Sequence, residues 1–447
     1  MAKKTPIQLS DHFSYGRLVR FTLPSIAMMI FTSIYGVVDG FFVSNFVGKT
    51  PFAAVNFIYP VLMILGCLGF MFGTGGSALV AMTMGMGDRK KAREIFSLLI
   101  YVAIGSGLVI AALGIAFLPA IAAALGAEGE MLAGCITYGR IILLAVPAYM
   151  LQYAFQSFFV TAEKPQLGLA VTIAAGVTNM VLDALLVAVF QFGLVGAAAA
   201  TALSQVVGGV IPLIYFSRPN TSTLRLGKTK WDGRALGKTC VNGSSELMTN
   251  IAMSLVSMLY NIQLMKYAGE NGVAAYGVLM YVCMIFLAVF IGYTVGVAPV
   301  IGFHYGAANH DELKGLRKKS FRIIGLCAVV MFLLAEFLLA EPLAALFVGY
   351  DPELMALTLH AFKIFSFVFL FAGFAIFGSG FFTALNNGLI SALIAFLRSL
   401  VFEAGFVLLL PLVFGMDGIW ISTAAAELVA ATLALSLMAV FRKKYHY

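Results

Sequence analysis

Long apolar stretches recur along the whole of this sequence and restrict what it can fold into. A helix that crosses a bilayer needs about 20 consecutive, mostly apolar residues. The 447 residues are 61% hydrophobic and 11% charged, with a mean hydropathy of +0.98, which excludes a water-soluble domain. We predict an all-α integral membrane protein with twelve transmembrane helices, at residues 17–44, 53–82, 95–120, 131–161, 166–190, 194–216, 236–266, 273–304, 319–345, 355–384, 388–413 and 417–441.

The positive charges predict the orientation of these helices. Lys and Arg residues gather near both ends of the chain, at residues 89–93, between the sixth and seventh spans, and at residues 314–322. By the positive-inside rule, we expect a multi-pass protein of the plasma membrane with both termini in the cytoplasm. The net charge of +8 then reflects orientation signals. We expect contact with the lipid bilayer and no contact with nucleic acid.

The two halves of the sequence resemble each other. The motif Phe-Gly-x-x-Gly at residues 192–196 recurs 222 residues later at 414–418, and Thr201 has a counterpart at the same offset in Thr423. Because six spans separate the copies, both have the same orientation in the membrane, and an axis along the membrane normal relates them. We predict two pseudo-symmetric six-helix lobes around a cavity: an N-terminal lobe (1–216), a cytoplasmic linker (217–235) and a C-terminal lobe (236–447).

Two acids stand within apolar spans of the first half. Asp39 belongs to the first span and Asp183 to the fifth, and a carboxylate at such a position costs at least about 2.5 kcal/mol, so it marks a functional site. Counting residues from the ends of the spans places both acids and Thr201 at a similar depth. Tyr35 and Asn179 precede the acids by one helical turn and share their faces. We therefore expect these five polar side chains to converge.

The chemistry of this group predicts ion binding. Two carboxylates in a poorly solvated site cannot both stay ionised cheaply, so the pair can take up and release a proton near physiological pH. The oxygens of Asp39, Asn179 and Asp183 could instead hold Na⁺. A purely structural hydrogen-bond network between helices is the alternative interpretation.

The second half provides an internal comparison for this site. At the corresponding positions of the second half, 221 or 222 residues later, Tyr260 replaces the first acid and Gly405 the second, Val401 replaces the amide, and only the threonine persists. Residues that the fold requires should occur in both copies. We therefore expect the acids to serve ion coupling in one lobe.

These residues resemble a known family across nearly the whole chain. A first span with Pro24 and the spacing Tyr35-x-x-x-Asp39, then Asn179-x-x-x-Asp183, are similar to the multidrug and toxic compound extrusion (MATE) family. The resemblance implies a monomeric, cation-coupled antiporter that exports small organic, often cationic substrates through inward-open and outward-open states. It also implies that ion binding at these positions is linked to bending of the first helix, for which Pro24 and Gly36 are candidate hinges.

The second lobe departs from the pattern of other MATE branches, which use acids of the seventh and tenth spans. Glu246 resembles the seventh-span acid, whereas the tenth span has no carboxylate. We therefore assign Glu246 to the substrate cavity or to secondary coupling, with a structural role as the alternative.

Several other polar residues lie within predicted spans. We expect internal ion pairs among the charged ones, which are Arg140, Glu336, Lys363, Arg398, Glu403 and Glu427. An unpaired Arg398 or Lys363 in the cavity would instead favour anionic substrates. Arg398 and Glu403 are candidates for the substrate cavity or secondary coupling. Gln152 and Gln156 lie one turn apart and are either cavity donors or contacts between helices.

The sequence contains no nucleotide-binding loop, metal-ligand cluster or nucleophile motif. We therefore expect neither an enzyme nor a cofactor, and a transport process that an ion gradient drives. The predicted function is multidrug efflux by H⁺ antiport with alternating access, with Na⁺ as the alternative coupling ion. The rival functions are a lipid-linked precursor flippase of the same superfamily and a non-transporting membrane receptor or scaffold.

Overall fold

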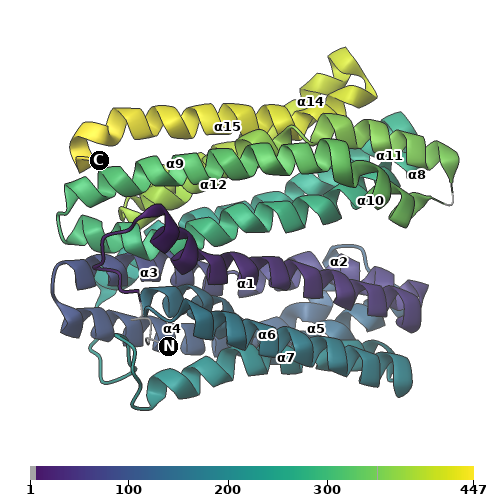
Figure 1. Ribbon diagram of the computed structural model, residues 1–447. Helices are drawn as coiled ribbons and strands as arrows, with labels where there is room; N and C mark the ends of the chain where they lie inside the picture. The colour runs from purple at the N-terminus through teal and green to yellow at the C-terminus, as the bar shows by residue number, and fades with distance from the viewer. Residues whose placement is uncertain (1–6, 350) are drawn as a thin grey trace, which may run out of the picture.

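The computed structural model describes residues 7–349 and 351–447, and within these ranges the regular secondary structure is entirely helical. The first half of the chain forms one lobe, drawn purple to teal in Figure 1. Its elements are α1 (Tyr15–Phe42), η1 (Val43–Val47), α2 (Lys49–Gly66), α3 (Leu68–Gly85), α4 (Arg89–Ala124), α5 (Gly129–Thr161), α6 (Pro165–Leu182), η2 (Asp183–Val189) and α7 (Gly193–Ser217).

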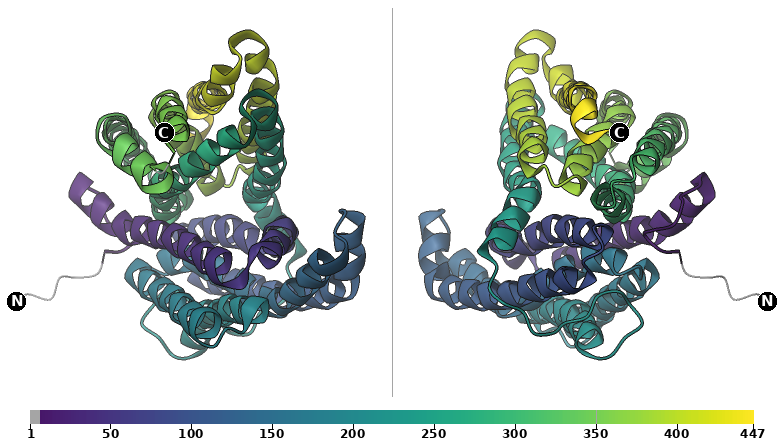
Figure 2. Two further views of the ribbon diagram at one scale, coloured as in Figure 1. Left: turned by 90° about the vertical axis from the view of Figure 1, so that its right-hand side faces the viewer. Right: turned by 90° about the vertical axis from the view of Figure 1, so that its left-hand side faces the viewer.

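The second half forms the other lobe, drawn in green to yellow over most of its length (Figure 1). The two views along the helices in Figure 2 separate the lobes clearly. The elements of this lobe are α8 (Gly233–Gly306), α9 (His310–Leu333), η3 (Leu334–Leu339), α10 (Ala340–Val348), α11 (Pro352–Phe365), α12 (Val368–Ala384), α13 (Gly388–Phe396), η4 (Leu397–Phe402), α14 (Glu403–Phe414) and α15 (Met416–Tyr445).

The described residues provide twelve membrane-spanning segments. Ten continuous helical segments are long and apolar enough to cross a membrane, and α11 with α12 forms an eleventh span with a 47° bend. The long helix α8 supplies two spans, because Gly269 interrupts it with non-helical backbone angles (φ 61°, ψ −150°). The predicted all-α fold with twelve spans in two lobes is therefore confirmed, and the segment between α7 and α8 comprises residues 218–232.

The repeated Phe-Gly-x-x-Gly motif makes the same turn in both lobes. Gly193 and Gly415 have φ angles of +60° and +59°, a conformation that side chains with a Cβ adopt only with strain. The second glycine of each motif packs against the preceding helix: a Cβ at Gly196 would lie 2.8 Å from the Leu186 carbonyl oxygen, and one at Gly418 would collide with the carbonyl of Leu410. The repeat therefore preserves glycines where the backbone needs them.

The two lobes meet closely at one end of the molecule. We call this the basic end, because the described chain starts here at residue 7 and ends here at residue 447, and because it carries the basic segments at residues 89–93 and 314–322. Here α3 packs against α8, and glycines allow their backbones to touch, since a Cβ at Gly85 would collide with Phe303 and one at Gly306 with Met82. Nearer the middle of the molecule, Gly292 and Gly296 of α8 approach α1 in the same way.

Candidate functional site

Four of the five predicted polar residues meet inside the first lobe. Asp39 lies in the last turn of α1, Asn179 in α6, Asp183 at the start of η2, and Thr201 in α7. The Thr201 hydroxyl donates a hydrogen bond to Asp39 Oδ1 at 3.3 Å. Asp183 and Asn179 lie close enough to interact with the Asp39 carboxyl. The two acids therefore face the same space, and neither is directed toward the opposite side of the bundle.

The two acids differ in their access to solvent. Asp39 is partly exposed, whereas Asp183 is 0% and Asn179 1% exposed. Both Asp183 oxygens and both amide atoms of Asn179 lack a hydrogen-bond partner within the described residues. A buried carboxylate without a donor is unfavourable by several kcal/mol at least. A proton on the pair, or a small cation among these oxygens, would satisfy the unpaired groups.

Local backbone geometry places Asp183 at this position. The helix changes from α to π winding at Asp183, and the π segment continues to Val189. Such segments are rare and occur frequently at functional sites. The corresponding helix of the second lobe also contains a π segment, Leu397–Phe402, but this segment ends before Gly405, the counterpart of Asp183. The π winding that starts at Asp183 is therefore a feature of the first lobe at this position.

The fifth predicted residue, Tyr35, lies beside this group and extends it inward. Its hydroxyl interacts with the side chains of Gln152 and Tyr153 on α5, and it remains within electrostatic reach of Asp39. A small residue makes this contact between helices possible, because a Cβ at Gly176 would come within 2.9 Å of the Tyr35 ring. Tyr35 therefore connects the acids to the polar face of α5.

The prediction missed the tyrosines on that face of α5. Tyr138 interacts with the Thr201 side chain, and Tyr153 with Tyr35. Tyr149 donates to the sulfur of Met63 at 3.1 Å. Their spacing could have revealed them, because Tyr138, Tyr149 and Tyr153 share one helical face with both predicted glutamines.

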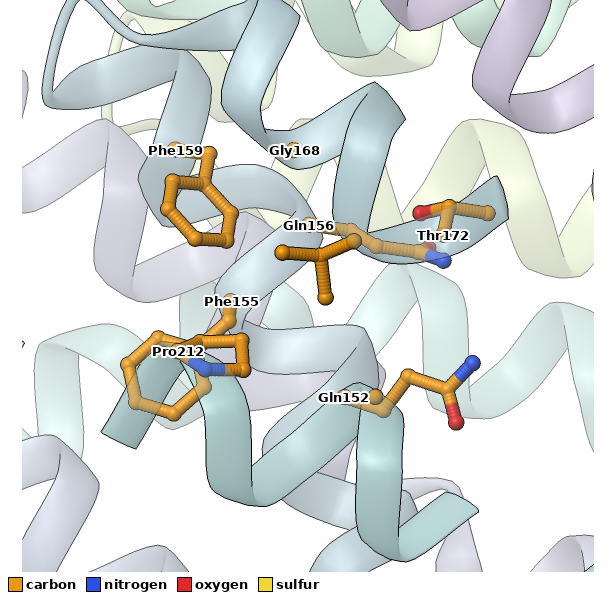
Figure 3. Close-up of a pocket in the computed structure, with 9 residues that line it drawn as sticks. Gln152, Phe155, Gln156, Phe159, Gly168, Thr172 and Pro212 are labelled. Carbon is orange, nitrogen blue, oxygen red and sulfur yellow. The ribbon is translucent and has the colours of Figure 1, made fainter. Parts of the chain in front are cut away.

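Gln152 and Gln156 line a small cavity inside the first lobe, between α5, α6 and α7 (Figure 3). The Gln156 amide extends toward Thr172 in this view, and its nitrogen has no hydrogen-bond partner among the described residues. The cavity holds about 10 Å³ of space for the centre of a water molecule, which suits one water. The structure thus places Gln156 at a space that suits one water, whereas the amide of Gln152 reaches toward Tyr35.

The second lobe has a neutral contact at the equivalent place. The Tyr260 hydroxyl and Thr423 Oγ1 are 2.6 Å apart and hydrogen-bonded. These residues stand at the repeat positions of Asp39 and Thr201. The second copy therefore keeps the bond between its first and last helices and replaces the titratable partner with a tyrosine.

A charged cluster lies deeper in the second lobe. Arg398 Nε is 3.0 and 2.9 Å from the two oxygens of Glu427, and its Nη2 is 2.7 Å from Oε1. The two side chains are 16% and 7% exposed. Glu246 and Glu403 are partly exposed and interact electrostatically with Arg398, and within the described part of the chain their side-chain carboxylates form no hydrogen bond or ion pair. The expected ion pair thus forms at Arg398, which is not free to receive an anion.

The other predicted positions are more scattered. Arg140 and Lys363 are exposed and form no ion pair within residues 7–349 and 351–447, so the expected pairing does not extend to them. Glu336 Oε2 accepts a hydrogen bond from Ser366 at 2.6 Å. The helix α1 continues through Pro24, which is buried, and through Gly36, whose Cβ position faces open space. The first helix is therefore unbroken at both candidate hinges.

Comparison with known proteins establishes the family. The sequence model of the MatE family matches residues 24–185 and again residues 247–409. The chain belongs to the MatE family. Its two matched segments fall in the two lobes, which agrees with the internal repeat. Relatives of this MatE protein include the multidrug export protein MepA of Staphylococcus aureus (strain MSSA476), which is 25% identical over 431 residues, or 96% of this chain and 94% of MepA.

A second relative and solved structures extend the comparison. MepA of Staphylococcus haemolyticus (strain JCSC1435) is 24% identical over 431 residues, with the same coverage of both chains. A MATE structure in complex with MaL6 superposes with a TM-score of 0.93 at 21% identity and covers 99% of each chain. An outward-facing multidrug resistance MATE transporter gives a TM-score of 0.92 at 21% identity, covering 100% of this chain and 99% of its own. The MatE chain thus shares the fold of these transporters.

Proposed function

We propose that this MatE protein is a secondary active transporter that exports organic, mostly cationic compounds in exchange for H⁺. Its relatives named MepA are multidrug export proteins, which also favours a transporter over an enzyme. The observation that carries the coupling proposal is the buried, unpartnered carboxylate of Asp183 beside Asp39. One chain contains both lobes, so a monomer is the proposed transport unit, and no step requires a cofactor.

The proposed orientation puts the basic end in the cytoplasm, in accordance with the positive-inside rule. The close contacts between α3 and α8 and between α1 and α8 then lie in the cytoplasmic half. The membrane half with the acids faces outward. This arrangement corresponds to an outward-facing state, in which Asp39 receives a proton from outside and shares it with the fully buried Asp183.

Coupling requires that the proton changes the relative stability of two states. A proton on the acid pair removes a buried negative charge and supplies the donor that the Asp183 oxygens lack. Protonation must therefore stabilise a conformation of α1 and α6 that holds a cationic substrate less well. The same oxygens of Asp39, Asn179 and Asp183 could hold Na⁺ as an alternative coupling ion.

The test uses purified protein in proteoliposomes, with ethidium as the substrate and with pH and Na⁺ gradients imposed separately. We expect the pH gradient alone to drive ethidium transport, and we expect Asp39→Asn and Asp183→Asn to abolish it without loss of folded protein. Glu130→Gln, which neutralises an exposed acid of α5, is the matched control and should transport normally. A wild-type rate from either aspartate variant would contradict the coupling role.

The same vesicles separate the rival functions. A Na⁺ gradient that drives transport without a pH gradient would assign Na⁺ as the coupling ion. Counterflow of labelled ethidium occurs only with a transporter, so its absence would favour a receptor or scaffold. A flippase for lipid-linked precursors needs a site for an anionic headgroup, and the closed Arg398–Glu427 pair disfavours this function. Transfer of lipid-linked sugars between leaflets by the purified protein would instead support the flippase function.

A further inference from the structure

The segment before α1 bridges both lobes at the basic end. We call residues 7–14 the strap. In Figure 1 the dark purple chain before α1 crosses this end between the second lobe, drawn in green, and the first lobe, drawn in blue. The Leu9 amide donates to Glu163 Oε1 at 2.7 Å, in the connection between α5 and α6 of the first lobe. The Phe13 amide donates to Glu312 Oε1 at 2.9 Å, in the first turn of α9 of the second lobe.

Glu312 uses both of its carboxylate oxygens on the strap. Its other oxygen, Oε2, lies 2.6 Å from His12 Nδ1. Nearby on α9, Lys319 donates to the Phe13 carbonyl. The Glu312 side chain is 8% exposed. A buried carboxylate without donors is strongly unfavourable, so Glu312 can leave the strap only when water enters this end of the molecule.

Apolar side chains anchor the strap beneath these polar contacts. Leu9 and Phe13 are both 0% exposed. The Phe13 ring packs edge-on against Phe21 of α1, with centroids 5.8 Å apart, and against His304 near the end of α8, with centroids 6.4 Å apart. The ring therefore sits in the seam between a helix of the first lobe and a helix of the second. Separation of the lobes here would expose it.

We propose that the strap closes the cytoplasmic end of the transporter and that Glu312 is the positioning residue that holds it. This inference rests on the proposed function, because an alternating-access cycle must open the seam between α8 and the first lobe. The bonds from His12 and Phe13 to Glu312 cross that seam, so opening breaks them. The bond from Leu9 to Glu163 stays within the first lobe and keeps the strap attached there. The strap thus stabilises the outward-facing state. On opening, it separates from the second lobe and stays bound to the first.

The test measures the distance across the seam by double electron–electron resonance in nanodiscs, without substrate or ion gradient. Spin labels at positions 90 and 318 report on the first and second lobes, because Lys90 and Lys318 are both exposed at the basic end. The native cysteines are replaced so that only these positions are labelled. We expect Glu312→Gln to raise the ratio of inward-open to outward-facing protein about tenfold, as the loss of a hydrogen bond to a charged group does.

Two further variants make the result specific. Phe13→Ala removes the apolar anchor and should shift the distances in the same direction. Asp311→Asn changes the adjacent acid, whose side chain is 99% exposed, and should leave the distances as in the wild type. Unchanged distances in both Glu312→Gln and Phe13→Ala would overturn the proposal. Because this readout involves no transport, it remains informative if the ethidium assay fails, and the two proposals are separately testable.

Discussion

Breaking the buried pair of Arg398 and Glu427 should reveal how the second lobe balances its charges. Two nitrogens of the guanidinium contact both carboxylate oxygens at 2.7 to 3.0 Å. Removing one partner of such a buried pair costs about 3–5 kcal/mol, because the remaining charge stays buried without compensation. Here the two removals should differ, since Glu246 and Glu403 also interact with Arg398.

The difference follows from what each variant leaves behind. Arg398→Met leaves three carboxylates without a counter-charge, so we expect the full loss of about 3–5 kcal/mol in the free energy of unfolding. Glu427→Gln leaves two carboxylates to compensate the guanidinium and keeps an oxygen acceptor at position 427. We expect it to lose only about 1–2 kcal/mol.

The assay is denaturant unfolding in detergent micelles, followed by far-UV circular dichroism. The control pair is Lys314 and Asp311, which are 3.7 Å apart and largely exposed, and its removal should cost less than about 1 kcal/mol. The double variant Arg398→Met/Glu427→Met should recover only part of the stability, because apolar side chains replace the buried pair well while Glu246 and Glu403 stay without a counter-charge. Equal losses for the two single variants would refute this account of the cluster.

Three shorter predictions concern the scaffold. Gly415→Ala forces a Cβ into a φ of +59° and should lower stability by about 1–2 kcal/mol, with a lower melting temperature as the readout. Tyr260→Phe removes the bond to Thr423 and should cost about 1 kcal/mol while proton-driven ethidium transport stays near the wild-type rate, because this contact carries no titratable acid. Loss of coupling in that variant would contradict the assignment of ion binding to one lobe. Gly306→Val places a side chain against the Met82 carbonyl, so labels at positions 90 and 318 should move apart, and unchanged distances would show that the seam tolerates the added bulk.

Much of the fold could be predicted because the membrane imposes simple rules on the sequence. Each span needs a long apolar window, and positive charges mark one set of ends. The turn at Gly193 was visible because its copy at Gly415 needs the same positive φ. The meeting of Asp39 and Asp183 followed from depth, since a helix rises by a fixed distance per residue.

The missed features depend on contacts that no period in the sequence encodes. Leu9 pairs with a residue 154 positions away, and Phe13 with one 299 positions away. The sequence of the strap contains no pattern that predicts contacts with such distant residues. Arg398 had several acids within its own lobe, and only the packing of α15 against η4 selects Glu427. The spacing of Gln152 and Gln156 shows that they lie one turn apart, but the neighbours that cover them depend on how α5, α6 and α7 pack together.

The bond between Tyr260 and Thr423 has a consequence for how such a transporter can diversify. This bond has no carboxylate that takes up a proton, so under the proposed function ion binding acts on the first lobe and the second lobe responds only through its contacts with the first. Substitutions that adapt the second lobe to new compounds would then leave the ion-coupling site of the first lobe unchanged. A duplicated fold with one ion-coupled lobe can in this way change its substrates without any change in ion coupling.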